Sequence, residues 1–128
     1  MNVRSLLENG VNTFEKLELI ILLHGAPRTV MSLAELTRRL GLESEVVRLA
    51  AAELRDAALV ELSSTGELQL LPPTSRDYEA VNELVRLYED DRLTIVKAIG
   101  EIAMGRIRTL ASQAFGEAFV VRKNRGDA

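Results

Sequence analysis

Hydrophobic residues in the first part of the chain recur at helical spacing, and clear end signals flank them. A first helix is expected from about 13 to 24, because Asn12 and Glu15 form a capping box at its start. Gly25 and Pro27 follow the last apolar turn and favour its end there.

A second and a third helix follow, separated by a short turn. Ser32 and Glu35 form another capping box, and Gly41 suits the left-handed conformation that ends a helix. Helical spacing restarts at Glu43 or Ser44. The stripe that this third helix should bury comprises Val47, Ala50, Ala51, Leu54 and Ala58. Two helices joined by so short a turn form a helix-turn-helix.

The apolar period then changes from helical to alternating. The alternating apolar positions are Val60, Leu62, Leu68 and Leu70. Between them, residues 63–66 end in Gly66, which can adopt positive φ, so the pattern predicts a β-hairpin. Pro72 and Pro73 close this unit, because proline cannot donate a hydrogen bond to a sheet and resists helix continuation.

The last third of the chain has the apolar spacing of helices. One helical face runs from about 75 to 91 and another from 95 to 121, with no proline between them. The polar run 89–92 is either a solvated turn of one long helix or the N-terminal cap of a second one, and we favour two helices with a bend. Gly100 and Gly105 indicate close approach of another helix or tolerated defects.

The net charge of −3 hides a segregation of charge along the chain. Residues 75–91 hold two arginines against six carboxylates, a net charge of −4, whereas residues 92–125 hold seven basic residues against two glutamates, a net charge of +5. Such blocks favour antiparallel pairing within one chain or between two copies, although an exposed ion pair contributes only about 0.2–1 kcal/mol. Two solvated faces are the alternative interpretation.

The segment from about 12 to 71 resembles the winged helix-turn-helix transcription regulators, of the multiple-antibiotic-resistance and metal-responsive repressor types. The residues that carry the resemblance by their spacing are Leu33, Ala34, Glu35, Leu36, Leu40, Gly41, Leu42, Val47, Leu54, Leu59 and Val60. The resemblance implies a mainly α fold with a small β-hairpin wing, followed here by a C-terminal helical extension. It also implies a DNA-binding transcriptional regulator that acts as a dimer.

In such regulators the helix after the turn enters the DNA major groove. The positions that would face the groove here are Glu43, Ser44, Glu45, Val46, Arg48 and Leu49. Among them Ser44 and Arg48 suit DNA, and folding could gather Arg28, Arg38 and Arg39 on the same side. These five residues are the candidate DNA contacts; a solvated face is the alternative for the arginines.

The charge of this region argues against DNA. Residues 26–60 hold five arginines against five carboxylates, and residues 63–67 offer no basic side chain to a phosphate. Val46 and Leu49 project off the buried stripe, so either the C-terminal helices or a protein partner should cover them. The alternative function is therefore a winged-helix protein-interaction module that does not bind DNA.

The apolar stripe of the C-terminal helices is longer than a small domain needs, so we expect it to pack against a second copy. The candidate dimer contacts are Ile99, Ala103, Ile107, Leu110 and Ala114. The alternative is that these helices fold back onto the helix at 13–24 of their own chain. The expected division is a winged-helix domain at 1–74, helices at 75–121 and a basic, disordered tail at 122–128.

Candidate chemistry is sparse. The chain has one histidine, His24, beside Gly25 at a helix end, and no cysteine, so no familiar nucleophilic or transition-metal constellation can be assembled. The longest apolar run, 19–23, is far too short to span a bilayer. We expect a cytoplasmic protein that is not an enzyme and has no cofactor, metal or membrane segment.

Overall fold

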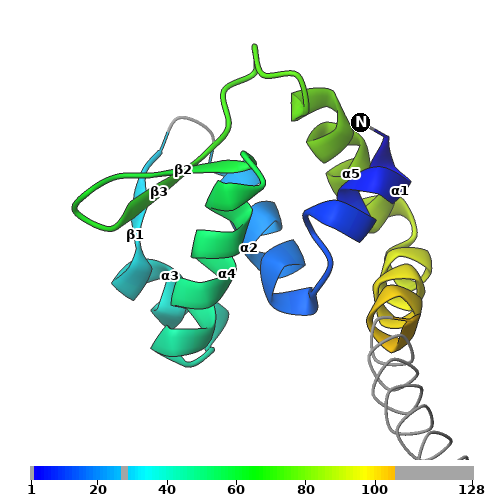
Figure 1. Cartoon of the computed structure of the whole chain (residues 1–128), viewed down its shortest axis with the longest axis horizontal. Coiled ribbons are helices and arrows are strands. Elements are labelled where there is room, and N and C mark those ends of the chain that lie inside the picture. Colours follow the sequence, from blue (N-terminus) through cyan, green and yellow to red (C-terminus); the bar gives the residue numbers. More distant parts are fainter. Residues whose placement is uncertain (1, 27–28, 106–128) are drawn as a thin grey trace, which may run out of the picture.

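The computed structural model describes residues 2–26 and 29–105, which form a mainly helical body with a small antiparallel sheet (Figure 1). The helices are α1 (Val3–Asn9), α2 (Phe14–His24), α3 (Leu33–Leu40), α4 (Ser44–Asp56) and α5 (Tyr78–Asp90), and the strands are β1 (Met31–Ser32), β2 (Val60–Leu62) and β3 (Glu67–Leu70). A further helix occupies residues 92–105, where the described part ends; we call it the 92–105 helix. Outside the described residues lie Arg28, Ile107, Leu110, Ala114 and the expected tail at 122–128.

The two ends of α3 follow the local signals. The Oγ of Ser32 accepts the backbone N–H of Glu35 at 3.1 Å, which confirms the expected cap. Gly41 ends the helix at a φ of +68°, in the left-handed region where glycine carries no steric penalty. The turn that follows is therefore sharp, and α4 begins at Ser44, as expected.

Helix α4 ends earlier than its apolar pattern predicts. The expectation that Ala58 belongs to the buried stripe is wrong, because Ala58 is exposed and adopts a φ of +61°. This left-handed residue lets the backbone N–H of Leu59 bond to the carbonyl of Leu54 at 3.0 Å. The turn buries Leu59 completely and directs the chain into β2.

The predicted hairpin is confirmed and gains a third strand (Figure 1). Strand β3 lies between β1 and β2, and its residue Leu68 is opposite Met31 on one side and Leu62 on the other. Gly66 closes the hairpin turn at a φ of +83°. Strand β1 has two residues, which is too short for an alternating pattern to reveal in the sequence.

Helix α1 has no counterpart in the sequence-based expectation. The side chain of Asn2 caps it by accepting the backbone N–H of Ser5 at 2.8 Å. Leu6 and Leu7 are buried, and α1 packs against α5. A helix of 7 residues has too few turns to give a periodic signal in the sequence. Its formation therefore depends on packing against other elements such as α5.

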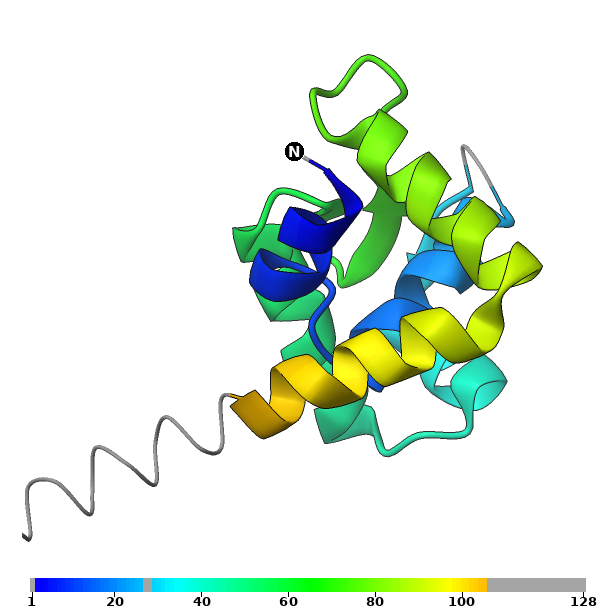
Figure 2. The same ribbon diagram turned by 90° about the vertical axis from the view of Figure 1, so that its right-hand side faces the viewer.

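The C-terminal helices bend at Asp91, which confirms two helices within the described residues (Figure 2). Asp91 accepts the backbone N–H of Thr94 at 3.3 Å and its hydroxyl at 2.6 Å, so it caps the 92–105 helix. At the same bend the Arg92 guanidinium lies over the Tyr88 ring, 5.0 Å from its centroid.

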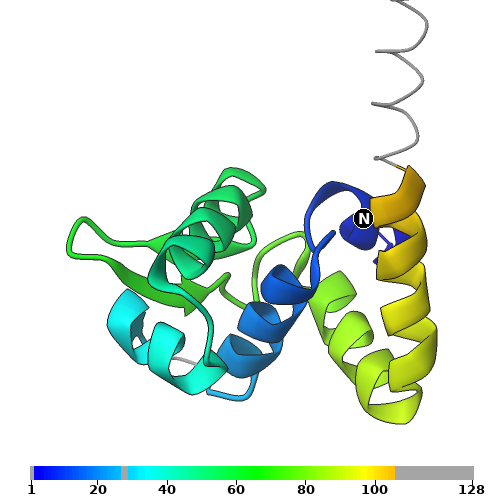
Figure 3. The same cartoon turned by 90° about the horizontal axis from the view of Figure 1, so that it is seen from below.

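These helices fold back onto their own chain. Helix α5 packs against α1 and α2, and Ile95 and Ile99 of the 92–105 helix are buried in the same core (Figure 3). Ile99, an expected dimer contact, is 0% exposed and offers no surface to a second copy. The described parts of the two expected domains therefore share one hydrophobic core.

One buried charge joins α2 to α4. The expected cap at Asn12 is wrong by one residue, because the Thr13 hydroxyl accepts the backbone N–H of Lys16 at 3.3 Å. Instead, Asn12 Oδ1 accepts a hydrogen bond from the Lys16 ammonium at 2.8 Å. The same ammonium forms an ion pair with Glu53 of α4. Lys16 is only 5% exposed, so its charge is kept in the core by these two oxygen partners.

We expect Glu53→Ala to lower the free energy of unfolding by about 1–2 kcal/mol, because it leaves the Lys16 ammonium with Asn12 alone. Lys16→Met should be close to neutral, since an apolar side chain of similar length needs no partner there. Urea unfolding measures both. Glu18→Ala, at an exposed position of α2, is the control; equal effects of Glu18→Ala and Glu53→Ala would contradict the assignment.

Asp91→Ala should lower the urea midpoint more than Asp90→Ala, which removes the same charge without the two cap hydrogen bonds. Hydrogen bonds from Thr94 lower the pKa of Asp91. The cap therefore stabilises fully above the usual aspartate pKa of about 3.9 and loses its effect as the pH falls through the lower folded-state pKa. Urea unfolding followed by circular dichroism across this acid range tests both expectations. If the difference in free energy of unfolding between Asp91→Ala and wild type stays constant at all pH values, that result argues against the cap.

Candidate functional site on helix α4

Helix α4 lies against α2, α3 and β2 and leaves one face uncovered within the described residues (Figure 3). Its inward side is set by Val47, Ala50, Ala51 and Leu54, four of the five predicted positions, all buried. The exposed residues of its first half are Glu43, Ser44, Glu45, Arg48 and Leu49. Five of the six positions predicted to face outward are therefore exposed. The sixth, Val46, is half-buried.

The exposed arginine of this face is paired with a carboxylate of the same helix. The Arg48 Nε donates to Glu45 Oε2 at 3.1 Å, and its Nη2 donates to the other carboxylate oxygen. The hydrogen bond from Arg48 lowers the pKa of Glu45, and the hydrogen bond from Glu45 raises the pKa of Arg48. Both groups therefore stay ionised at neutral pH, and their charges cancel on this part of the surface.

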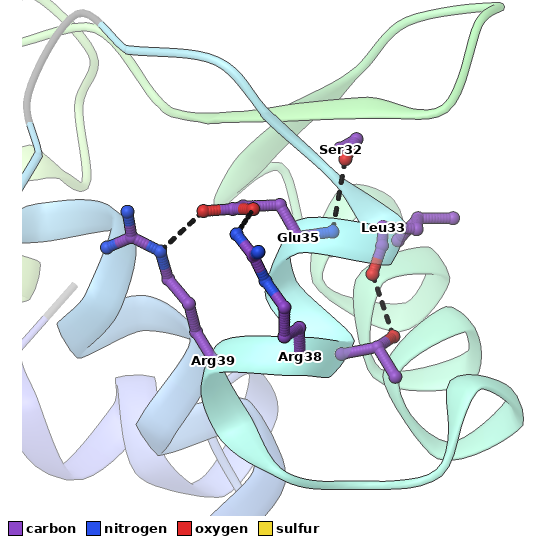
Figure 4. A network of polar contacts seen from close by, with 6 residues as sticks. Ser32, Leu33, Glu35, Arg38 and Arg39 are labelled. Atoms are coloured by element: carbon purple, nitrogen blue, oxygen red, sulfur yellow. Dashed lines mark hydrogen bonds and ion pairs between the residues drawn. The ribbon is translucent and has the colours of Figure 1, made fainter.

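The two arginines of α3 share one carboxylate (Figure 4). Arg39 Nε donates to Glu35 Oε1 at 2.7 Å, and Arg38 Nη2 donates to Glu35 Oε2. The hydrogen bond from Arg39, with the charges of both arginines, lowers the pKa of Glu35. Glu35 thus holds both side chains on α3, separately from the Arg48 pair on α4.

The hairpin tip has no basic side chain. Its hydroxyls bond to one another and to a carboxylate: Ser63 Oγ lies 2.9 Å from Thr65 Oγ1, which donates to Glu67 Oε1 at 2.9 Å. Residues 29–74 as a whole hold four arginines against seven carboxylates, a net charge of −3. Arg55, the fourth arginine, is 3.5 Å from Asp56, so every arginine of this segment has a carboxylate partner.

A second polar arrangement joins α2 to α5 and could not be anticipated from sequence. His24 Nε2 lies 2.6 Å from Asn82 Oδ1, across 58 positions of the chain. These residues line a surface groove of about 460 Å³ with Glu79, Glu83 and Glu89. Within residues 2–26 and 29–105 no group of three or more ligating side chains could hold a metal ion.

Comparison with protein-family models, with curated proteins and with solved structures gives no significant match to this chain. Among the helices described, none combines the length and the apolar character needed to cross a bilayer.

Leu49→Gln should leave the free energy of unfolding within about 0.5 kcal/mol of wild type, because Leu49 is 50% exposed. Two positions earlier, Val47→Ala should cost about 1–3 kcal/mol through loss of buried methyl groups. Urea denaturation of the two variants measures the contrast. A large loss for Leu49→Gln would mean that part of the chain covers this face.

Proposed function

We propose that this chain is a winged-helix regulatory module that binds a protein partner through the exposed face of α4. The order of α3, a sharp turn, α4 and a hairpin supports the winged-helix assignment, together with the resemblance of residues 12–71 to such regulators. Helices that follow the turn in such folds are recognition elements, and α4 is open along its first half.

The observation that carries the proposal is the internal neutralisation of the arginines. DNA binding draws most of its affinity from cations that displace counterions from phosphates. Arg38, Arg39 and Arg48 are instead paired with Glu35 and Glu45. A phosphate would have to displace a carboxylate from each of them while approaching a segment of net charge −3.

The same face suits a protein surface. Leu49 is 50% exposed and Val46 is half-buried, and the neutral pair of Arg48 and Glu45 lies beside them on the same turns. Protein interfaces typically combine a core that is depleted of charged residues with a polar rim. Leu49 would be the anchor of this interface, with Glu43 and Ser44 at its rim.

DNA is the second candidate, and one observation favours it. Ser44 and Arg48 are exposed at the start of the helix that follows the turn, which is where a major-groove contact would lie. For this function, binding would have to transfer Arg48 from Glu45 to a phosphate or a base edge.

Fluorescence anisotropy with a mixed-sequence DNA duplex at low salt discriminates between protein binding and DNA binding as the function of α4. We expect no binding by the wild-type chain. The variant Glu35→Gln/Glu45→Gln should gain weak, salt-sensitive binding, because it frees three arginines. Wild-type binding that Arg48→Ala abolishes would instead establish the DNA function and overturn the proposal.

The partner itself can be sought with a photo-crosslinking amino acid at position 49 in the native host. Arg4, on α1, is an exposed control position. A discrete protein adduct from position 49 that is absent from position 4, and that is lost in Glu45→Arg, supports the proposal. Adducts to DNA from position 49 would favour the second candidate.

A further inference from the structure

Strand β2 lies at one edge of the sheet, next to β3 (Figure 1). Just after the strand, the backbone N–H of Ser63 bonds to the carbonyl of Glu67 at 2.9 Å. In an antiparallel pair, positions that bond to the partner strand alternate with positions whose backbone groups point away from it. Glu61, two residues before Ser63, therefore has its backbone groups toward β3, whereas those of Val60 and Leu62 point to the open edge.

These edge groups are unpaired in the part of the chain that the structure describes. Within residues 2–26 and 29–105, no backbone hydrogen bond joins Val60 or Leu62 to an element on the side away from β3. Two N–H donors and two carbonyl acceptors in one row form a template for an added strand. Unpaired backbone groups are rarely shut off from water, so we expect this edge to be accessible.

A hollow adjoins the edge on the outer face of the sheet. Glu61 is exposed and lies opposite Gln69, and both residues line this hollow, whose volume is about 290 Å³. The other residues that line it are Leu70, Leu71, Pro72, Pro73 and Tyr78. Its floor is therefore largely apolar, with one carboxylate at its border. Lysine and arginine combine an aliphatic stem with a cationic head, which suits both parts of such a hollow.

We infer that β2 binds an extended segment of a partner protein in antiparallel orientation, with a lysine or arginine opposite Glu61. The backbone of this segment pairs with Val60 and Leu62 and adds a strand to the sheet. Charge complementarity selects a basic segment, because residues 59–78 hold one arginine against three carboxylates, a net charge of −2. The inference goes beyond the function proposed for α4, since none of these residues belongs to that helix.

A second copy of this chain suits the edge less well. Two antiparallel β2 strands that use all four edge groups place Val60 opposite Leu62 and Glu61 opposite its own counterpart. In that arrangement Glu61 occupies a position without inter-strand hydrogen bonds, where opposed side chains come closest. Like charges directly opposite each other destabilise a strand pair. The carboxylate that favours a basic segment therefore disfavours self-pairing.

A synthetic peptide tests the strand addition on the full chain. The probe is a seven-residue peptide with a central lysine, a valine on each side of it and threonines outside. When it saturates the chain, the amide protons of Val60 and Leu62 should exchange with solvent about threefold more slowly or less, as measured by NMR. Methylation of the two valine nitrogens should abolish binding, because these N–H groups donate to the edge carbonyls.

Three results of this experiment would overturn the inference. They are undiminished binding of the N-methylated peptide, no binding of the unmodified peptide at millimolar concentration, and protection of the Val60 and Leu62 amides that rises with protein concentration without peptide. The third result would assign the edge to a second copy.

Glu61→Lys tests the charge preference. Wild type should bind the lysine peptide at least about threefold more tightly than a peptide with glutamate in its place, and Glu61→Lys should reverse that order. Glu61 is exposed, so circular dichroism should show an intact fold. Glu18→Lys makes the same change of net charge at an exposed position of α2 and should keep the wild-type preference. Equal affinity of wild type for the two peptides contradicts a basic partner.

Discussion

Burial of α2 on nearly every side is the constraint on which the rest of this structure depends. Leu17, Leu19, Ile20 and Leu23 are all buried, although they point in different directions around the helix. A helix with apolar residues on so many of its sides must be largely enclosed. Helices α3 and α4 with β3 cover one side of α2 and α5 covers another, so the helix-turn-helix and the C-terminal helices share one core.

That enclosure determines which surfaces remain for partners. Helix α4 uses one stripe against α2 and presents the opposite side of its first half, where charges are cancelled within the helix. The 92–105 helix uses Ile95 and Ile99 against the core and presents Leu93 and Met104. Both helices thus combine a face that stabilises the fold with a second face that residues 2–26 and 29–105 leave uncovered.

Features that depend on residues close in sequence were predictable. Ser32 and Glu35 are three residues apart, and Gly41 and Gly66 occupy positions where positive φ is required. Features that depend on remote residues were not. Helix α1 forms against α5, Lys16 pairs with Glu53, and Ile99 is covered by the core of its own chain, so no local pattern could assign them. For the candidate site, the pattern identified the outward residues of α4. The pairs of Arg48 with Glu45 and of Arg38 and Arg39 with Glu35 have helical spacings of three and four, so a local signal for them was present in the sequence as well.

The sequence by itself determined where α2, α3, α4 and the hairpin lie, because capping, glycine geometry and apolar periodicity act over a few residues. It also determined the opposed charge blocks of the C-terminal third, which are a property of composition. Only the tertiary structure decided which of two apolar faces of the 92–105 helix enters the core and which side of α4 stays open. Each choice depends on burial against elements tens of residues away, and burial is a property of the whole fold rather than of any segment.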